Sequence, residues 1–420
     1  MVRSQSLIGT LRNLRGNARG AVLTEPLWGI PFNLFAPYVS IYMVALGLRD
    51  SQVGLVTSVA LSGQIVFALL SGIITDRLGR RRATFIFDIL AWSVPCLIWA
   101  SAQSLVWFLA AGLVNSLRRI PDISWNCILV EDTDPADLAH IYSWVYLAGQ
   151  LSVFFAPLAG LLIRRYTLVP TMRGLYLLAF AMMTVKFVIL NSLVTETRQG
   201  RVRMAETRGR AVLELLGEYR GVIRHILATP HTLYTIALMV VMSIVMMIQG
   251  TFWSILVTER LHIPAGQIAL YPFARSLIML LFLFLVVPRL RGLNFGRPMT
   301  LAFAGFLLSQ LLLVTIPAKG YGLLLVSTML ESCSYAVLGT QTDRLSVINV
   351  APEERARIVS VAHVVIIACT TPFGWIGGVL AERSPIDPFL LNAALLGAGI
   401  VLVQLLRRTG ADAAHEAPAA

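Results

Sequence analysis

The stretch GIITDRLGRRRATF, from Gly72 to Phe85, lies between two long apolar runs and holds one aspartate, four arginines and two glycines. This density of charge is unusual in a chain of 420 residues, of which 57% are hydrophobic and only 13% are charged. Soluble proteins carry roughly twice that share of charged residues. Long apolar runs separated by short charged segments are typical of transmembrane helices joined by loops, and they argue against a soluble helical protein.

Apolar runs near 20 residues long follow one another on both sides of this stretch. The longest polar stretch, at about 195–230, separates six of these runs from six others. The sequence therefore predicts an all-α membrane protein with two bundles of six transmembrane helices. The twelve predicted spans are residues 22–47, 52–73, 83–102, 105–128, 140–162, 174–194, 232–256, 267–288, 298–317, 321–345, 357–380 and 388–406.

The distribution of arginine predicts the orientation of these spans. An even number of spans places both termini on one side, and most arginines lie in the loops on that side. The positive-inside rule then predicts an inner-membrane protein with both termini in the cytoplasm. The second half of the central loop has helical periodicity, which suits a helix on the membrane surface. The predicted parts are a basic cytoplasmic tail (1–21), an N-terminal bundle (22–194), a central cytoplasmic loop (195–231), a C-terminal bundle (232–406) and a disordered tail (407–420).

An internal repeat relates the two halves of the chain. The segment DPADLAHIYS at 134–143 matches APEERARIVS at 351–360 in four positions, with an offset of 217 residues. The same offset aligns Gly79–Arg80 with Gly296–Arg297, and an offset of 215 aligns Pro157 with Pro372. Two copies of six spans in the same orientation predict a pseudo-two-fold bundle with a seam between its halves. This is the geometry of an alternating-access carrier.

Each residue type in the opening stretch suits a loop between two spans. Gly72 would let a neighbouring helix approach closely. Asp76 would bind an arginine or a helix N-terminus, and Gly79 would supply a turn conformation that other residues resist. The run Arg80 to Arg82 would anchor the loop to anionic lipid headgroups. Positive charge facing the cytoplasm explains the arginines alone, but it does not explain the spacing of the glycines and the aspartate.

The pattern G-x-x-x-D-R-x-G-R-R resembles the signature loop of the major facilitator superfamily. The resemblance covers nearly the whole chain, because the twelve predicted spans, the central loop and a degraded copy of the pattern after span eight also fit. It implies a transporter in which this loop latches the two halves on the cytoplasmic side and opens during transport. The residues assigned to the latch are Gly72, Asp76, Arg77, Gly79 and Arg80.

A second pattern, SVFFAPLAG in span five, resembles the G-P-x-x-G motif of drug–proton antiporters. Ala156 replaces the glycine before Pro157, and Gly160 is kept. The resemblance implies proton-coupled export, whereas the simpler interpretation of Pro157 is a helix kink. The arginine motif of many proton-coupled members is absent from the start of span four, so their coupling mechanism does not carry over directly.

Ionisable residues inside a span cost about 2.5–3.5 kcal/mol on insertion scales, so each needs a partner, water or a function. Span four holds Arg118, Arg119 and Asp122. We expect one arginine to pair with Asp122 and the other to face a wet cavity, another carboxylate or substrate. A purely structural ion-pair cluster is the alternative. Asp88 and Lys186 lie in spans expected at the periphery, where the Lys186 side chain would extend to the interface.

Span one contains a helix-start signal and a candidate binding wall. Thr24 is the expected N-cap with Glu25 in the first turn, and proton coupling by Glu25 is the alternative. Asn33 lies among aromatic residues and prolines, and pseudosymmetry places Gln249 of span seven opposite. Aromatic and amide groups suit a mid-sized organic molecule, and ordinary helix packing is the alternative.

Span ten contains the preferred coupling residue. Glu331 lies near the middle of the span, with Tyr335 four residues later. A buried carboxyl can bind and release a proton in the working range. Arg275 of span eight would pair with Glu331 or bind an anionic group. A permanent ion pair of Glu331 with Arg275 or Arg119 is the alternative.

Together these features predict a secondary active transporter that works by alternating access, with proton-coupled export of small organic molecules as the leading interpretation. The alternatives are an uptake symporter or facilitator for a polar or anionic solute, such as a sugar or an organic acid, and a membrane receptor. No phosphate-binding glycine loop, metal-ligand cluster or nucleophile constellation is present in the sequence. We therefore expect no enzyme activity, cofactor or metal. The expected partners are a small-molecule substrate, protons and the lipid bilayer, without nucleic acid, and the protein is expected to be a monomer.

Overall fold

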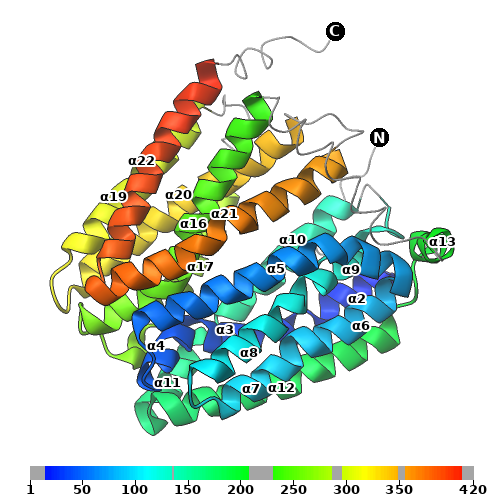
Figure 1. Cartoon of the computed structure of the whole chain (residues 1–420), viewed down its shortest axis with the longest axis horizontal. Coiled ribbons are helices and arrows are strands. Elements are labelled where there is room, and N and C mark those ends of the chain that lie inside the picture. Colours follow the sequence, from blue (N-terminus) through cyan, green and yellow to red (C-terminus); the bar gives the residue numbers. More distant parts are fainter. Residues whose placement is uncertain (1–14, 135–136, 208–229, 286–295, 349–354, 409–420) are drawn as a thin grey trace. The chain divides into compact units, whose positions relative to one another are not determined.

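The computed structural model describes residues 15–134, 137–207, 230–285, 296–348 and 355–408, and these residues form helices and no strands (Figure 1). Eleven helical stretches among them are long and apolar enough to cross a membrane. The predicted fourth span is a further stretch, built from α8 (Leu105–Asn115), η3 (Ser116–Arg118) and α9 (Arg119–Val130), with three charged residues near its middle. The prediction of an all-α membrane protein is confirmed, and these stretches agree with the twelve predicted spans.

The chain divides into two compact units, each described here by itself. Unit 1 comprises Met1–Gly47 and Val59–Leu215, and unit 2 comprises Leu48–Ser58 and Leu216–Ala420. The remaining described helices of unit 1 are α2 (Gly16–Thr24), α3 (Pro26–Phe35), η1 (Ala36–Tyr38), α4 (Val39–Ala45), most of α5 (Asp50–Leu78), α6 (Arg80–Asp88), η2 (Ile89–Ser93), α7 (Val94–Ser101), α10 (Leu138–Val153), α11 (Ala156–Tyr166), α12 (Leu168–Leu193) and α13 (Arg198–Glu206). Those of unit 2 are α16 (Pro230–Glu259), η4 (Ala265–Gln267), α17 (Leu270–Leu285), α19 (Gly296–Thr315), α20 (Tyr321–Ile348), α21 (Arg355–Arg383) and α22 (Asp387–Arg408).

The ends of the bundles differ from the sequence prediction in two places. The predicted N-terminal tail contributes Gly16 and the following residues to α2, because Ala18 and Ala21 pack in an apolar core with Ile128. The central loop holds α13 in its first half, where the sequence predicts no helix. The helix predicted in its second half, at 208–229, and residues 409–420 of the predicted disordered tail lie outside the described residues.

Proline lies at breaks in two spans of unit 1. Proline has no N–H to donate and its ring clashes with the preceding turn. The fifth span is broken between Val153 and Ala156, with Pro157 in the first turn of α11, so the predicted kink is confirmed. The fourth span passes through the short 3-10 turn η3 just before Pro121. These breaks free backbone carbonyls within the membrane-spanning part of unit 1.

The core of unit 2 shows how these helices associate. Phe303 and Phe306 of α19 are fully buried against Leu396 and Val403 of α22. Lipid tails are as apolar as these side chains, so close packing rather than removal from water holds the helices together. Gly399 of α22 makes this possible, because a Cβ there would lie 2.5 Å from the ring of Phe303.

The start of α5 packs within unit 2 against α21. A Cβ on Gly54 would lie 2.3 Å from the carbonyl oxygen of Gly374, and one on Gly378 would lie 3.0 Å from Cα of Ser51. The hydroxyl of Ser58 donates to the Thr371 carbonyl at 2.6 Å, and the Trp375 N–H donates to that hydroxyl at 2.7 Å. Glycine and serine therefore bring these two backbones into direct contact.

Candidate functional site

The signature loop forms a tight turn between two helices of unit 1. The helix α5 ends at Leu78 and α6 begins at Arg80, so Gly79 alone connects them. Gly79 has φ +83° and ψ 160°, a region that is essentially restricted to glycine. A Cβ at this position would also lie 2.5 Å from Oε2 of Glu196. The turn predicted at Gly79 is confirmed, and it brings Arg80 back toward Asp76.

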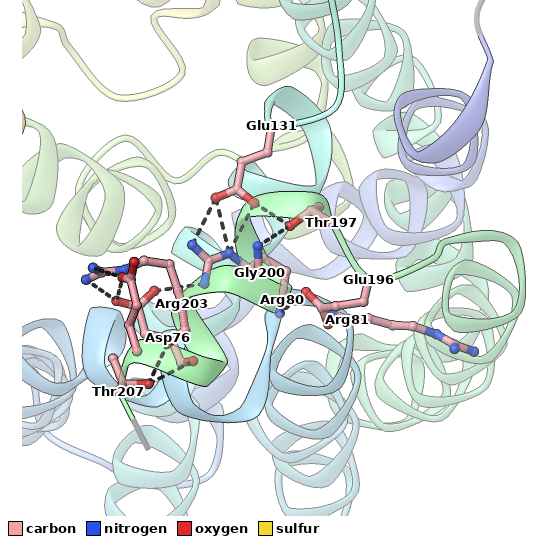
Figure 2. A network of polar contacts seen from close by, with 10 residues as sticks. Asp76, Arg80, Arg81, Glu131, Glu196, Thr197, Gly200, Arg203 and Thr207 are labelled. Carbon is pink, nitrogen blue, oxygen red and sulfur yellow. Dashed lines mark hydrogen bonds and ion pairs between the residues drawn. The ribbon is translucent and has the colours of Figure 1, made fainter. Parts of the chain in front are cut away.

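Asp76 binds two arginines from different parts of unit 1 (Figure 2). Its Oδ1 accepts from Nη1 of Arg80 at 2.8 Å, and its Oδ2 accepts from Nη2 and Nε of Arg203 at 2.8 and 3.1 Å. Arg203 belongs to α13, 127 residues further along the chain. The predicted pairing of Asp76 with an arginine is confirmed, and it docks α13 onto the end of α5.

Arg80 is held by a second carboxylate. The side chain of Glu131, which follows α9, accepts from Nε and Nη2 of Arg80 at 2.9–3.1 Å. The hydroxyl of Thr197 donates to the same carboxylate. Arg80 is only 5% exposed, so the prediction that it anchors to lipid headgroups is wrong. Its charge is compensated inside the protein, as a buried guanidinium requires.

The backbone at the start of α6 is capped by a distant residue. The carboxylate of Glu196 accepts from the N–H groups of Arg80 and Arg81 at 2.8 and 3.1 Å. The first N–H groups of a helix lack partners within it, and a negative charge there is favourable. We name Asp76, Arg80, Glu131, Glu196, Thr197 and Arg203 the Asp76 network.

The hydrogen bonds from Arg203 to Asp76 raise the pKa of the Arg203 guanidinium above its ordinary value. A raised pKa means that this contact favours the docked state wherever Arg203 is protonated, and that it is lost only as pH rises through that pKa. Arg203 therefore stays charged throughout the physiological range. Its side chain is 37% exposed, so salt weakens the contact.

The structure also shows the surroundings of Gly72 and the exposure of the other arginines in the signature loop. Among the described residues of unit 1, no atom outside the backbone of its own helix lies within 4 Å of the position that a Cβ on Gly72 would take, so the close helix approach predicted there is not observed. Arg77 and Arg82 are exposed. Sequence reasoning missed Glu131, Glu196 and Arg203 as network members, although an acidic segment directly after span four was a signal for Glu131.

A second polar site lies in unit 2. Glu331 of α20 is 3% exposed, and its Oε1 lies 2.9 Å from Nη1 of Arg275 on α17. Its Oε2 accepts from Nε2 of Gln249 on α16 at 2.7 Å. The guanidinium of Arg275 lies over the ring of Tyr335, 5.3 Å from its centroid. We name these four residues the Glu331 cluster.

The structure therefore brings together four of the predicted site residues from three helices. Gln249 was predicted to face span one, but its amide donates to Glu331 within unit 2. In unit 1, the side-chain amide of Asn33 donates to the Gly29 carbonyl, one turn earlier in its own helix.

The two arginines of span four share one buried amide. Oε1 of Gln64 accepts from Nη2 of Arg118 at 3.2 Å and from Nε of Arg119 at 2.9 Å. Nη1 of Arg119 lies 3.4 Å from Oδ2 of Asp122, so one arginine pairs with Asp122 as predicted. Within the described chain Arg118 has no carboxylate partner. Gln64, on α5, was not predicted from the sequence.

The prediction of a helix start at Thr24 and Glu25 and the prediction that Lys186 extends to the interface are wrong. Thr24 does not cap a helix, because its hydroxyl donates back to the Gly20 carbonyl and the backbone stays helical through Glu25. The Glu25 carboxylate instead accepts from Nζ of Lys186 at 3.1 Å. Lys186 is buried and does not extend to the interface.

Several solved structures share this fold. The nucleoside transporter NupG is 15% identical and superimposes with a TM-score of 0.69, over 94% of this chain and 99% of that one. A POT family transporter in complex with 5-aminolevulinic acid is 13% identical, with a TM-score of 0.67 over 93% and 95% of the two chains. The human organic anion transporter MFSD10 (TETRAN) is 15% identical, with a TM-score of 0.60 over 92% and 98%. At these identities the similarity shows the fold alone.

The family model described as Major Facilitator Superfamily matches residues 28–366, which is most of the chain. A search of curated proteins found no matching sequence. The matched region includes the signature loop, the Glu331 cluster and the arginines of span four. The chain therefore belongs to the Major Facilitator Superfamily and is a multi-pass membrane protein with the transporter fold of that family.

Proposed function

We propose that this protein is a proton-coupled secondary transporter that exports small organic molecules by alternating access across the inner membrane. Glu331 is the proton-coupling residue, and both termini face the cytoplasm. The observation that supports the proposal is the burial of Glu331 beside Arg275 and Gln249. The break at Pro157, in the segment that resembles the antiporter motif, supports the direction of transport.

The chemistry of coupling follows from the charge of the Glu331 cluster. With both groups ionised, the pair of Glu331 and Arg275 is neutral inside the bundle and is therefore tolerated there. A proton that binds Glu331 cancels its charge and weakens its hold on Arg275. The same proton removes the acceptor that a donor group of the substrate would use, so proton and substrate compete for Glu331. A proton that binds from outside releases the substrate there, and loss of that proton to the cytoplasm restores the pair, which links proton entry to export.

The Asp76 network controls conformation in this proposal rather than contacting substrate. Asp76 and Glu131 together compensate Arg80 and Arg203, and no charge is left over in this set of four. The network fixes α13 to unit 1, so the first part of the central segment moves with that unit during transport.

A second candidate is uptake of an anionic solute, and the position of Arg118 favours it. Arg118 is partly buried and binds only the neutral amide of Gln64 among the described residues. An anionic group of the substrate would supply the missing countercharge.

The test uses a bacterial strain that lacks its own efflux pumps, with growth measured against a panel of toxic compounds and toxic metabolite analogues. Export predicts resistance that is lost in Glu331→Gln, whereas uptake predicts new sensitivity. Glu382→Gln is the matched control, because Glu382 is an exposed partner of Arg49 at 3.4 Å. Equal amounts of folded protein in the membrane are confirmed for each variant. Full proton-linked transport by Glu331→Gln would overturn the role of Glu331.

A further inference from the structure

Unit 1 contains a buried group of charges that the proposed coupling at Glu331 does not use. Nζ of Lys186 on α12 lies 3.1 Å from Oε2 of Glu25, which connects α2 and α3. Asp88, the last residue of α6, interacts electrostatically with both. Lys186 and Asp88 are 5% and 7% exposed. We name Glu25, Asp88 and Lys186 the Lys186 triad.

Aromatic rings surround the ammonium of the triad. Nζ of Lys186 lies 6.0, 5.8 and 5.7 Å from the ring centroids of Trp28, Trp125 and Phe187. Aromatic faces attract a cation, and the attraction is stronger away from water. Trp28 is itself fixed by the edge of Trp92 at 5.0 Å. This shell holds the charge of Lys186 in place next to both carboxylates.

The charges of the triad do not balance. One lysine faces two carboxylates, so the triad has a net charge of −1 when all three groups are ionised. Glu25 takes the direct contact with Lys186. Within the described part of the chain, the Asp88 carboxylate accepts no hydrogen bond. A buried carboxylate without a donor is costly in its ionised form.

The other groups near Asp88 do not supply the missing donor. Asp122 on α9 is a further negative charge that acts on Asp88. Arg81 lies near the other end of α6, and its Nε donates to the Asn191 carbonyl at 3.0 Å. The hydroxyls of Thr84 and Ser124 bind each other at 2.6 Å. The surroundings therefore add negative potential at Asp88 without neutralising it.

The backbone around Asp88 is also irregular. After Asp88 the helix passes into the five-residue π turn Ile89–Ser93, which carries Trp92. Single π turns inside α-helices occur frequently at functional sites. Trp92 in this turn packs its ring against Trp28 of the aromatic shell.

We propose that Asp88 is a second proton-binding site of this protein, with the ion pair of Glu25 and Lys186 as its fixed counter-charges. A proton from water binds a carboxylate oxygen of Asp88 and brings the triad from −1 to neutral. Loss of that proton is tolerated because Lys186 lies nearby. A proton fits this site better than a metal cation, because the ammonium of Lys186, which already pairs with Glu25, would repel a second cation.

The site lies in unit 1, whereas Glu331 lies in unit 2, so the two can be tested separately. Infrared difference spectra of the purified full-length protein, recorded between alkaline and acidic buffer, report the carbonyl stretch of protonated carboxyl groups. We expect Asp88→Asn to lose one such signal and Glu331→Gln to retain it. This readout does not require transport, so it distinguishes failure of this site from failure of the proposed function.

A second variant tests the counter-charge. Lys186→Met removes the positive charge, so Asp88 should hold its proton to more alkaline buffer and its signal should persist there. Lys186→Arg keeps the charge, so its signal should appear over the same pH range as that of the wild type. This variant can be measured even if Lys186→Met fails to fold. An Asp88→Asn spectrum identical to that of the wild type would overturn the proposal. So would a wild-type signal that responds to sodium at constant pH instead of to protons.

Discussion

Arg203 of α13 binds Asp76 of α5 through two nitrogens, Nη2 at 2.8 Å and Nε at 3.1 Å, on the same carboxylate oxygen. The contact joins the central segment of the chain to the end of a membrane-spanning helix in unit 1. Such charge-assisted pairs fix geometry as well as contributing free energy. The helix α13 is therefore part of the folded unit and not merely a linker.

We expect Arg203→Gln to loosen α13 by about 1 kcal/mol, or about fivefold in its opening equilibrium, because the contact is charged but partly exposed. Hydrogen exchange of the amides at 198–206 measures this opening. Arg198→Gln is the control, because within the described chain only the backbone N–H of Arg198 forms a hydrogen bond, with Asp132. Equal exchange in the two variants would show that Asp76 does not dock this helix.

Gly79→Ala should destabilise the protein by about 1–3 kcal/mol, because the backbone conformation there is nearly restricted to glycine and the new Cβ would meet Glu196. Thermal unfolding in detergent measures the loss. Gly72→Ala is the matched control. Gly72 is helical, and among the described residues no atom outside its own helix backbone lies within 4 Å of the added Cβ, so stability should stay unchanged or rise slightly. A Gly72→Ala variant as unstable as Gly79→Ala would contradict this account of the loop.

Much of this loop could be predicted from the sequence, because a glycine between charged residues at the end of an apolar run marks a turn that needs a conformation other residues resist. The partners of Arg80 could not, since Glu131 and Glu196 lie 51 and 116 residues further along the chain. Composition identifies charges near a membrane edge, but it does not say which of them meet. Arg80 was therefore assigned to lipid headgroups, although two carboxylates of its own unit surround it.

Arg275→Gln should destabilise unit 2 by about 1–3 kcal/mol, less than the loss of one partner in a fully buried pair, because the Arg275 side chain is 26% exposed. The double variant Arg275→Gln/Glu331→Gln should recover most of this loss, since no buried charge is then left alone. Unfolding measurements on the two single variants and the double variant give the coupling free energy. A double variant whose loss equals the sum of the single losses would show that the two groups do not interact.

The Glu331 cluster was predictable in part for a physical reason. Charged residues are so costly in a span that those on neighbouring helices tend to find one another. The same reasoning failed for Lys186, because the expected position of its span suggested access to the interface. The shell of Trp28, Trp125 and Phe187 that encloses Lys186 comes from three separate helices, and a one-dimensional pattern does not reveal it.

Arg118→Gln should weaken binding of anionic compounds more than Arg119→Gln, because Arg119 already has Asp122 within 3.4 Å. About a tenfold loss of affinity would correspond to one charge-assisted contact of about 1.4 kcal/mol. Thermal-shift titrations with organic anions and matched neutral analogues measure the difference. Identical losses in the two variants, or losses that do not depend on the charge of the compound, would count against an anion-binding role for Arg118.

The order in which the residues of the Asp76 network occur along the chain has a consequence for biosynthesis. While the nascent chain is shorter than 196 residues, the start of α6 has no carboxylate to accept its N–H groups, and α13 has not yet been made. The signature loop therefore cannot mature when its own two helices enter the membrane. It is completed only after the sixth span has been made and the ribosome has added Arg203. The segment that follows the first six spans therefore completes the folding of the unit that precedes it.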